Sequence, residues 1–77
     1  MDKLTEKIHM QYLQAEIMKM QKTFEDLDKM IDESKQNKDS ELVETLQDLQ
    51  KITFDTIEHK KEELKKLYNI EIKADNN

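Results

Sequence analysis

The sequence predicts an all-α fold, an antiparallel two-helix hairpin, and three observations lead to it. The chain of 77 residues contains no glycine, proline or cysteine, so the residues that most turns and β-rich folds use are missing. Glutamate, lysine, glutamine, leucine and methionine dominate, and these side chains lose little rotamer freedom in a helix. Two long segments carry apolar residues at alternating spacings of three and four, and one short polar run separates them.

The first helix is predicted to run from about residue 2 to residue 35. Its apolar residues follow the heptad spacing of a helix that packs along one stripe, here called the seam. These seam residues are Met10, Leu13, Ile17, Met20, Phe24, Leu27 and Ile31. The polar run Ser34–Ser40 ends the seam, and we predict a turn over about residues 36–39 with Asn37 in the left-handed conformation. Either Asp39 or Ser40 is then expected to cap the second helix.

The second helix is predicted over about residues 40–68, folded back along the first because the connection is short. Pairing about the turn places Ile17 near Ile57, and Phe24 and Met20 opposite Gln50 and Thr53. The predicted seam consists of Val43, Leu46, Gln50, Thr53, Ile57, Lys60, Leu64 and Leu67, widened by Leu42, Leu49, Phe54 and Tyr68.

The last part of the chain is predicted to be a flexible tail over residues 69–77, with Asn69 ending the second helix. Alternation of apolar and charged residues over Ile70–Lys73 leaves a short strand as the alternative.

Several apolar residues of the first helix fall outside its seam, in a row on the outward side. This outer row consists of Leu4, Ile8, Tyr12, Ala15 and Met18. A row of large apolar residues usually marks a contact surface, and a chain this small buries little core alone. The sequence therefore predicts a homodimer, a four-helix bundle held partly by this row, with another protein as the further expected partner. Ile52 is also off the seam and is explained as an isolated exposed residue.

Charge and composition exclude several classes of function. The net charge of −5 removes the electrostatic attraction on which nucleic-acid binding depends, so no direct nucleic-acid partner is expected. No run of about 18 apolar residues occurs, so no membrane partner is expected, and the polar N-terminal segment does not resemble a signal peptide. We therefore expect a cytoplasmic location. All 13 basic residues are lysine, which is typical of an AT-rich bacterial or phage genome.

The two histidines of the chain are candidate metal ligands. His9 follows Glu6 at a spacing found in carboxylate-bridged metal sites of helix bundles. The hairpin places His59 near Ala15, however, so the two histidines do not converge. We expect His9 to be a solvent-exposed helix residue, no metal or other cofactor to be held, and no catalytic arrangement that would make the chain an enzyme.

The segment DSELVETLQDLQKI, Asp39–Ile52, resembles the signature of the small aspartyl-phosphate phosphatases of the sporulation phosphorelay. Those proteins are also short helical hairpins, and their second helix carries Ser-Gln-Glu-Leu-Asp. The corresponding residues here are Leu46, Gln47, Asp48, Leu49 and Gln50, so the serine and the closing acid are both replaced. The resemblance implies a phosphatase-like regulator of a response regulator, with Gln47 and Gln50 as the candidate catalytic residues. A seam glutamine that fixes helix register is the alternative explanation of Gln50.

The leading interpretation is a small non-enzymatic protein–protein interaction module, which acts as a regulator, inhibitor or adaptor and docks through its helical faces. The phosphatase-like regulator is the first alternative. A second alternative is an acidic mimic that inhibits a nucleic-acid-binding protein through the negative patch of the first helix. That patch consists of Glu25, Asp26, Asp28, Asp32 and Glu33.

Overall fold

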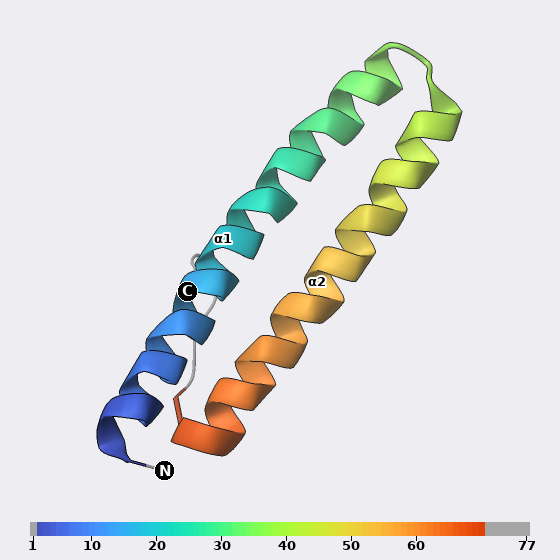
Figure 1. Ribbon diagram of the computed structural model, residues 1–77. Helices are drawn as coiled ribbons and strands as arrows, with labels where there is room; N and C mark the ends of the chain where they lie inside the picture. The colour runs from blue at the N-terminus through green and yellow to red at the C-terminus, as the bar shows by residue number, and fades with distance from the viewer. Residues whose placement is uncertain (1, 71–77) are drawn as a thin grey trace.

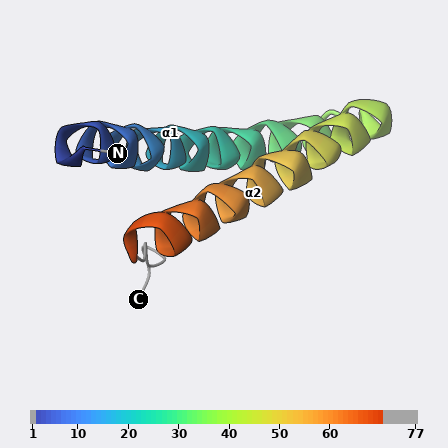
Figure 2. The same cartoon turned by 60° about the horizontal axis from the view of Figure 1, so that its bottom comes forward.

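The computed structural model describes residues 2–70 and confirms the antiparallel helical hairpin (Figure 1). Helix α1 spans Lys3–Gln36 and helix α2 spans Ser40–Tyr68, so each boundary lies within one residue of its predicted position. The hairpin measures 53 × 25 × 16 Å along its principal axes. The two helices meet at the turn and diverge toward the open end, where α1 begins and α2 ends (Figure 2). Most of the predicted tail, residues 71–77, lies outside the described residues, as does most of the alternative strand.

Both helices begin at an aspartate whose carboxylate caps the first turn. The Asp2 carboxylate accepts a hydrogen bond from the Thr5 amide at 2.8 Å, and the Asp39 carboxylate accepts one from the Leu42 amide at 3.2 Å. Each cap satisfies one of the amides that the first turn of a helix leaves unpaired. Of the two caps that the sequence offered for α2, the structure therefore uses Asp39.

The turn corrects one prediction, because its left-handed residue is Lys38 and not Asn37. Asn37 has right-handed helical dihedrals, φ −82° and ψ 0°, whereas Lys38 has φ 59°. Two backbone hydrogen bonds close the turn, from Asp39 N to Ser34 O at 3.0 Å and from Lys38 N to Lys35 O at 3.1 Å. This is the Schellman pattern, in which the left-handed residue follows the C-cap. Since α1 extends one residue further than predicted, that position falls on a lysine.

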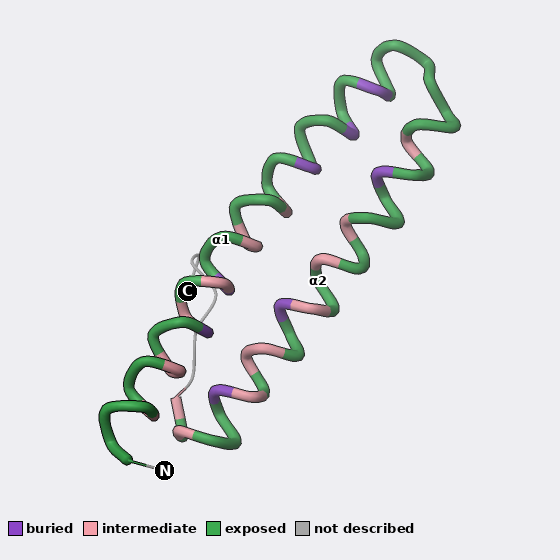
Figure 3. Tube along the Cα trace, viewed as in Figure 1, coloured by how far each residue is buried: buried purple, intermediate pink, exposed green. Residues whose placement is uncertain are grey.

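The core consists of two apolar clusters along the facing sides of the helices (Figure 3). The cluster toward the open end contains Leu13, Ile17, Ile57 and Leu64, with Met10, Met20, Phe24 and Tyr68 packed against it. The cluster near the turn contains Leu27, Ile31 and Leu46, with Val43 beside them. The predicted pairing is confirmed, since Ile17 shares a cluster with Ile57 and Leu27 shares one with Leu46.

The edges of the predicted seam need correction. Leu67 is 57% exposed, and the seam of α2 continues from Leu64 to the half-buried Tyr68 instead. The seam has an average spacing of 3.5 residues and drifts around a helix with 3.6 residues per turn, so that at the end of α2 a step of four keeps the side chain facing α1 and a step of three no longer does. Leu42 and Leu49 do not widen the core, because both are exposed. Phe54 is half exposed, but its ring lies 6.3 Å from the ring of Phe24 across the hairpin, so it extends the edge of the core as predicted. On α1 the seam runs one step further than predicted, to the buried Ser34.

Candidate functional site

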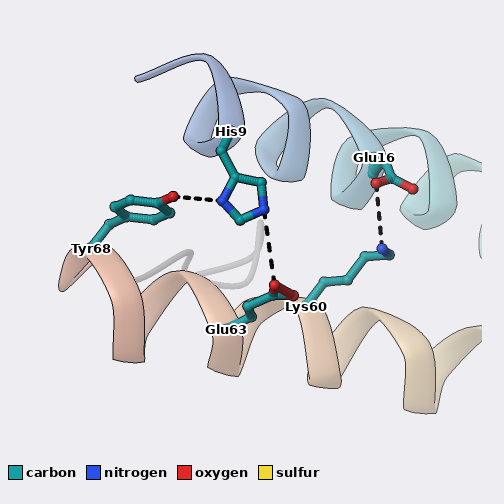
Figure 4. A network of polar contacts seen from close by, with 5 residues as sticks. All are labelled: His9, Glu16, Lys60, Glu63 and Tyr68. Atoms are coloured by element: carbon teal, nitrogen blue, oxygen red, sulfur yellow. Dashed lines mark hydrogen bonds and ion pairs between the residues drawn. The ribbon is translucent and has the colours of Figure 1, made fainter. Parts of the chain in front are cut away.

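A histidine–tyrosine contact joins the two helices at the open end of the hairpin (Figure 4). His9 Nδ1 lies 2.5 Å from the Tyr68 hydroxyl, and the two rings meet edge to face with centroids 5.7 Å apart. His9 Nε2 lies 4.0 Å from the Glu63 carboxylate. The predicted solvent-exposed His9 is therefore half-buried, with a side chain that is 38% exposed and contacts α2. The contact joins residues 59 apart in sequence, so no local pattern could have revealed it.

A second polar contact crosses between the helices closer to the turn, two turns further along α1. Lys60 Nζ lies 3.4 Å from the Glu16 carboxylate, and the two side chains are 23% and 32% exposed (Figure 4). Lys60 occupies a predicted seam position, and its aliphatic stem can lie against apolar neighbours while the ammonium reaches outward. Glu58 and Lys61, three residues apart on α2, also form an ion pair, at 3.7 Å. Within residues 2–70, no group of three or more His, Cys, Asp or Glu side chains is placed to hold a metal ion.

Gln50, one of the two candidate catalytic residues, is engaged between the helices. Its amide nitrogen donates to the Asp28 carboxylate at 2.6 Å and lies 3.4 Å from the Phe24 carbonyl oxygen, both on α1. Gln47 is exposed on α2. The structure therefore gives the two glutamines different environments. Gln50 lies between the two core clusters and contributes a polar contact that fits only one register of the helices.

The outer row is exposed along the first half of α1. Leu4 is 68% exposed, Ile8 59%, Tyr12 62% and Met18 69%, and Ala15 is also exposed. Spacings of three and four residues place these side chains on neighbouring turns, on the side of α1 opposite the buried Leu13 and Ile17. The row therefore lies on one helix only, and it faces away from α2.

A second uncharged surface, which the sequence analysis missed, runs along α2. Its residues are separated by three, four, three and four positions: Leu42, Thr45, Leu49, Ile52 and Thr56. Leu42 is 44% exposed, Leu49 47% and Ile52 61%. The charged residues in the same stretch keep to another side of the helix, again at spacings of four, three and four: Glu44, Asp48, Lys51 and Asp55.

The threonines of this surface need no hydrogen-bond partner from outside the helix. The Thr45 hydroxyl donates to the Glu41 carbonyl at 3.2 Å, and the Thr56 hydroxyl donates to the Ile52 carbonyl at 2.9 Å. A hydroxyl that bonds back to its own helix leaves little unsatisfied polarity when the face is covered. Burial of this surface against another apolar surface would therefore leave few polar groups without a hydrogen-bond partner.

The two helices contribute to this surface together. Glu63, which contacts His9 across the hairpin, is seven residues after Thr56 and occupies the same heptad position as Leu42, Leu49 and Thr56. On α1, the heptad position of His9 and Glu16 is occupied nearer the turn by two uncharged residues, Thr23 and Met30. One flank of the hairpin therefore has two halves. At the open end it carries the polar contacts between the helices, and near the turn its residues are uncharged. We call the uncharged half the flank face: Thr23, Met30, Leu42, Thr45, Leu49, Ile52 and Thr56.

The acidic patch of α1 is partly engaged within the chain. Asp28 accepts the hydrogen bond from Gln50, and Asp26 lies 4.0 Å from the Lys22 ammonium. These contacts give two of the five acidic residues a partner on the hairpin itself, which weakens the case for a surface that imitates the regular charge spacing of nucleic acid.

Comparisons of the chain with protein-family models, with curated proteins and with solved structures gave no match. Neither of the two described helices is long and apolar enough to cross a membrane.

Proposed function

We propose that this chain is a small non-enzymatic protein–protein interaction module, a regulator, inhibitor or adaptor that works as a homodimer and docks on another protein. The observation that carries the proposal is the outer row. It keeps four large apolar side chains about two-thirds exposed on a hairpin that has few apolar residues to form its core. Rows of this kind are typical of helices that lie against an apolar surface of a partner.

The outer row suits a second helix or an apolar groove. Its side chains extend over about four turns of α1, from Leu4 to Met18, which is long enough to hold a set of anchors at i, i+3, i+4 and i+7 of the kind by which a helix docks in a groove. Met18 has a flexible thioether side chain that adapts to the shape of a partner. Burying one side chain of leucine or isoleucine size contributes about 1.5–3 kcal/mol, so the row can offset part of the cost of association.

A pull-down with matched variants tests this proposal. The tagged wild type, Ile8→Glu and Gln47→Glu are each used to capture proteins from the native host, followed by mass spectrometry. Both variants add one negative charge at an exposed position, but only Ile8 belongs to the outer row. We expect a protein that the wild type and Gln47→Glu capture and that Ile8→Glu loses.

The captured protein is then purified and titrated against the same three chains by calorimetry. A charge in the centre of the contact should weaken binding by roughly tenfold or more. Equal binding of all three chains would contradict the assignment of the outer row as the docking site.

A further inference from the structure

We propose that the flank face is the surface through which two copies of this chain associate. This deepens the homodimer of the proposed function, because it assigns the interface to a different surface from the outer row. The outer row lies on α1 alone and faces away from α2, so a two-fold contact through it would join α1 to α1 outside the core. The flank face lies beside the seam on both helices, so a second hairpin stacked on it would extend the core into a four-helix bundle.

Charge favours a second copy over a charged partner. Each chain carries a net charge of −5, so two copies repel one another unless they meet where charges are absent. Along Leu42–Thr56 the charged residues occupy a different side of α2, and the flank face contains none. In a two-fold contact the same surface of both copies meets, so a charged surface would place like charges close together. An uncharged surface avoids this repulsion.

The sizes of the side chains also fit a two-fold contact. The five flank-face residues of α2 are centred on Leu49, with Leu42 seven residues before it and Thr56 seven residues after. An antiparallel approach of two α2 helices about Leu49 places Leu42 opposite Thr56 of the second copy. It also places Ile52 near Thr45 of the second copy. Large side chains opposite small ones allow facing helices to interdigitate, so this face complements itself.

The position of the polar contacts agrees with this arrangement. Beyond Thr56 the same flank carries the Glu16–Lys60 and His9–Glu63 pairs, which are satisfied within the hairpin. An axis near Leu49 keeps the contact in the half of the hairpin near the turn and leaves these polar contacts exposed to water. Two copies thus associate without removing an ion pair from solvent, which is a costly step.

Charge-swap variants test the interface. Size-exclusion chromatography with light scattering is run at tens of micromolar on the wild type, Leu49→Lys, Leu49→Glu and an equimolar mixture of the two variants. Because Leu49 meets its own equivalent, we expect each variant alone to dimerise about a hundredfold more weakly. The mixture should recover the dimer mass, since the lysine of one variant then faces the glutamate of the other. Leu49 is 47% exposed, and circular dichroism checks that each variant is as helical as the wild type.

Met18→Lys is the matched control on the outer row and should remain dimeric. The absence of cysteine provides a second readout, because a single introduced cysteine can only link two copies. Leu49→Cys should form a disulfide-linked dimer under mild oxidation, and Met18→Cys should not. A monomeric wild type would overturn the homodimer itself, whereas a wild-type dimer that Leu49→Lys leaves intact and Met18→Lys dissociates would overturn only the flank face.

Discussion

The side-chain amide of Gln50 on α2 donates to the carboxylate of Asp28 on α1, with 2.6 Å between Nε2 and Oδ1. The same nitrogen lies 3.4 Å from the Phe24 carbonyl oxygen, so the amide reaches α1 at the boundary between the two core clusters. A shift of one helical turn would separate these groups, while the apolar seam could repack. We therefore expect this contact to help select the register of the hairpin.

Replacing Gln50 should lower stability where replacing Gln47 does not. A hydrogen bond to a partly exposed carboxylate contributes about 1 kcal/mol, so Gln50→Ala should lower the melting temperature by about 4–8 °C. Gln47 is exposed, and Gln47→Ala should leave the melting temperature within the error of the measurement. Thermal unfolding followed by circular dichroism distinguishes the two variants, and equal losses from both would contradict the register role.

The phosphatase-like alternative makes a different prediction for the same glutamines. To orient an attacking water, the Gln50 amide would have to leave Asp28, so we expect no acceleration of phosphate loss from acyl-phosphorylated receiver domains of the host. The decay of the phosphorylated receiver is followed with and without the protein, with Gln47→Ala as the matched variant. Acceleration by the wild type that Gln47→Ala or Gln50→Ala abolishes would replace the interaction module with the phosphatase.

Ile17 is fully buried at the centre of the larger cluster. Ile17→Asn places an amide without partners there and should cost about 3–5 kcal/mol, enough to leave much of the chain unfolded. Ile17→Val removes one methylene and should cost about 0.5–1.5 kcal/mol, which a urea titration can resolve if the asparagine variant does not fold. Met18→Asn, one position away and 69% exposed, should have little effect. If Met18→Asn is as damaging as Ile17→Asn, the seam is wrongly assigned.

The turn can be made more stable at Lys38. A lysine with φ 59° has a side chain that crowds its own backbone, which costs about 1–2 kcal/mol. Glycine has no side chain and is free of this strain. Lys38→Gly should therefore raise stability by about 1 kcal/mol and the melting temperature by about 4–8 °C. Lys35→Gly, three residues earlier in the last turn of α1, should lower stability by about as much. A loss of stability at Lys38→Gly would contradict the left-handed turn.

The N-terminal cap should make the start of α1 sensitive to acid. The hydrogen bonds from the Thr5 amide favour the charged form of Asp2 and lower the pKa of its carboxyl below the ordinary value for aspartate. Its contribution to stability is therefore complete above the pKa of the unfolded chain and is lost as the pH falls through the lowered folded pKa.

The Asp2 carboxyl and the Thr5 amide should titrate together in NMR spectra, with a midpoint below that of an unstructured aspartate. Asp2→Asn keeps an oxygen at the cap and should remove this titration from the Thr5 amide. A Thr5 amide that titrates unchanged in Asp2→Asn would show that another group is responsible.

The hairpin could be predicted from the sequence because the signals that specify it, the spacing of apolar residues and the polar run at the turn, are local or periodic. The seam of α1 has seven members, from Met10 to Ile31, at the heptad spacing. The absence of glycine and proline argues against the turn-rich β folds that would compete with a helical one. The position of the turn follows from the absence of apolar residues in Ser34–Ser40. Which residue becomes left-handed was not predictable to one position, because helix length and cap geometry decide it together.

The flank face was not predictable in the same way. Its α2 residues, Leu42, Thr45, Leu49, Ile52 and Thr56, repeat at the same spacing as the true seam, shifted by one residue. Two such patterns on one helix differ by about a quarter of a turn, so periodicity alone cannot say which of them faces α1. Only the exposure of each side chain in the folded hairpin separates them. The contact of His9 with Tyr68 was hidden for a related reason, since it depends on the register of helices far apart in sequence.

Because one short turn joins the helices, the contacts between them are expected to form in order from the turn toward the open end. The Gln50–Asp28 contact closes a loop between residues 22 apart, and the His9–Tyr68 contact closes one between residues 59 apart. Loop-closure entropy grows with the length of the loop, so contacts form first near the turn and are lost first at the open end. Thermal opening therefore starts at Tyr68 and His9, while the segment that carries the flank face stays paired. We expect two associated copies to hold each other by the part of the hairpin that opens last, so that α1 and α2 can separate at the open end without dissociating the dimer.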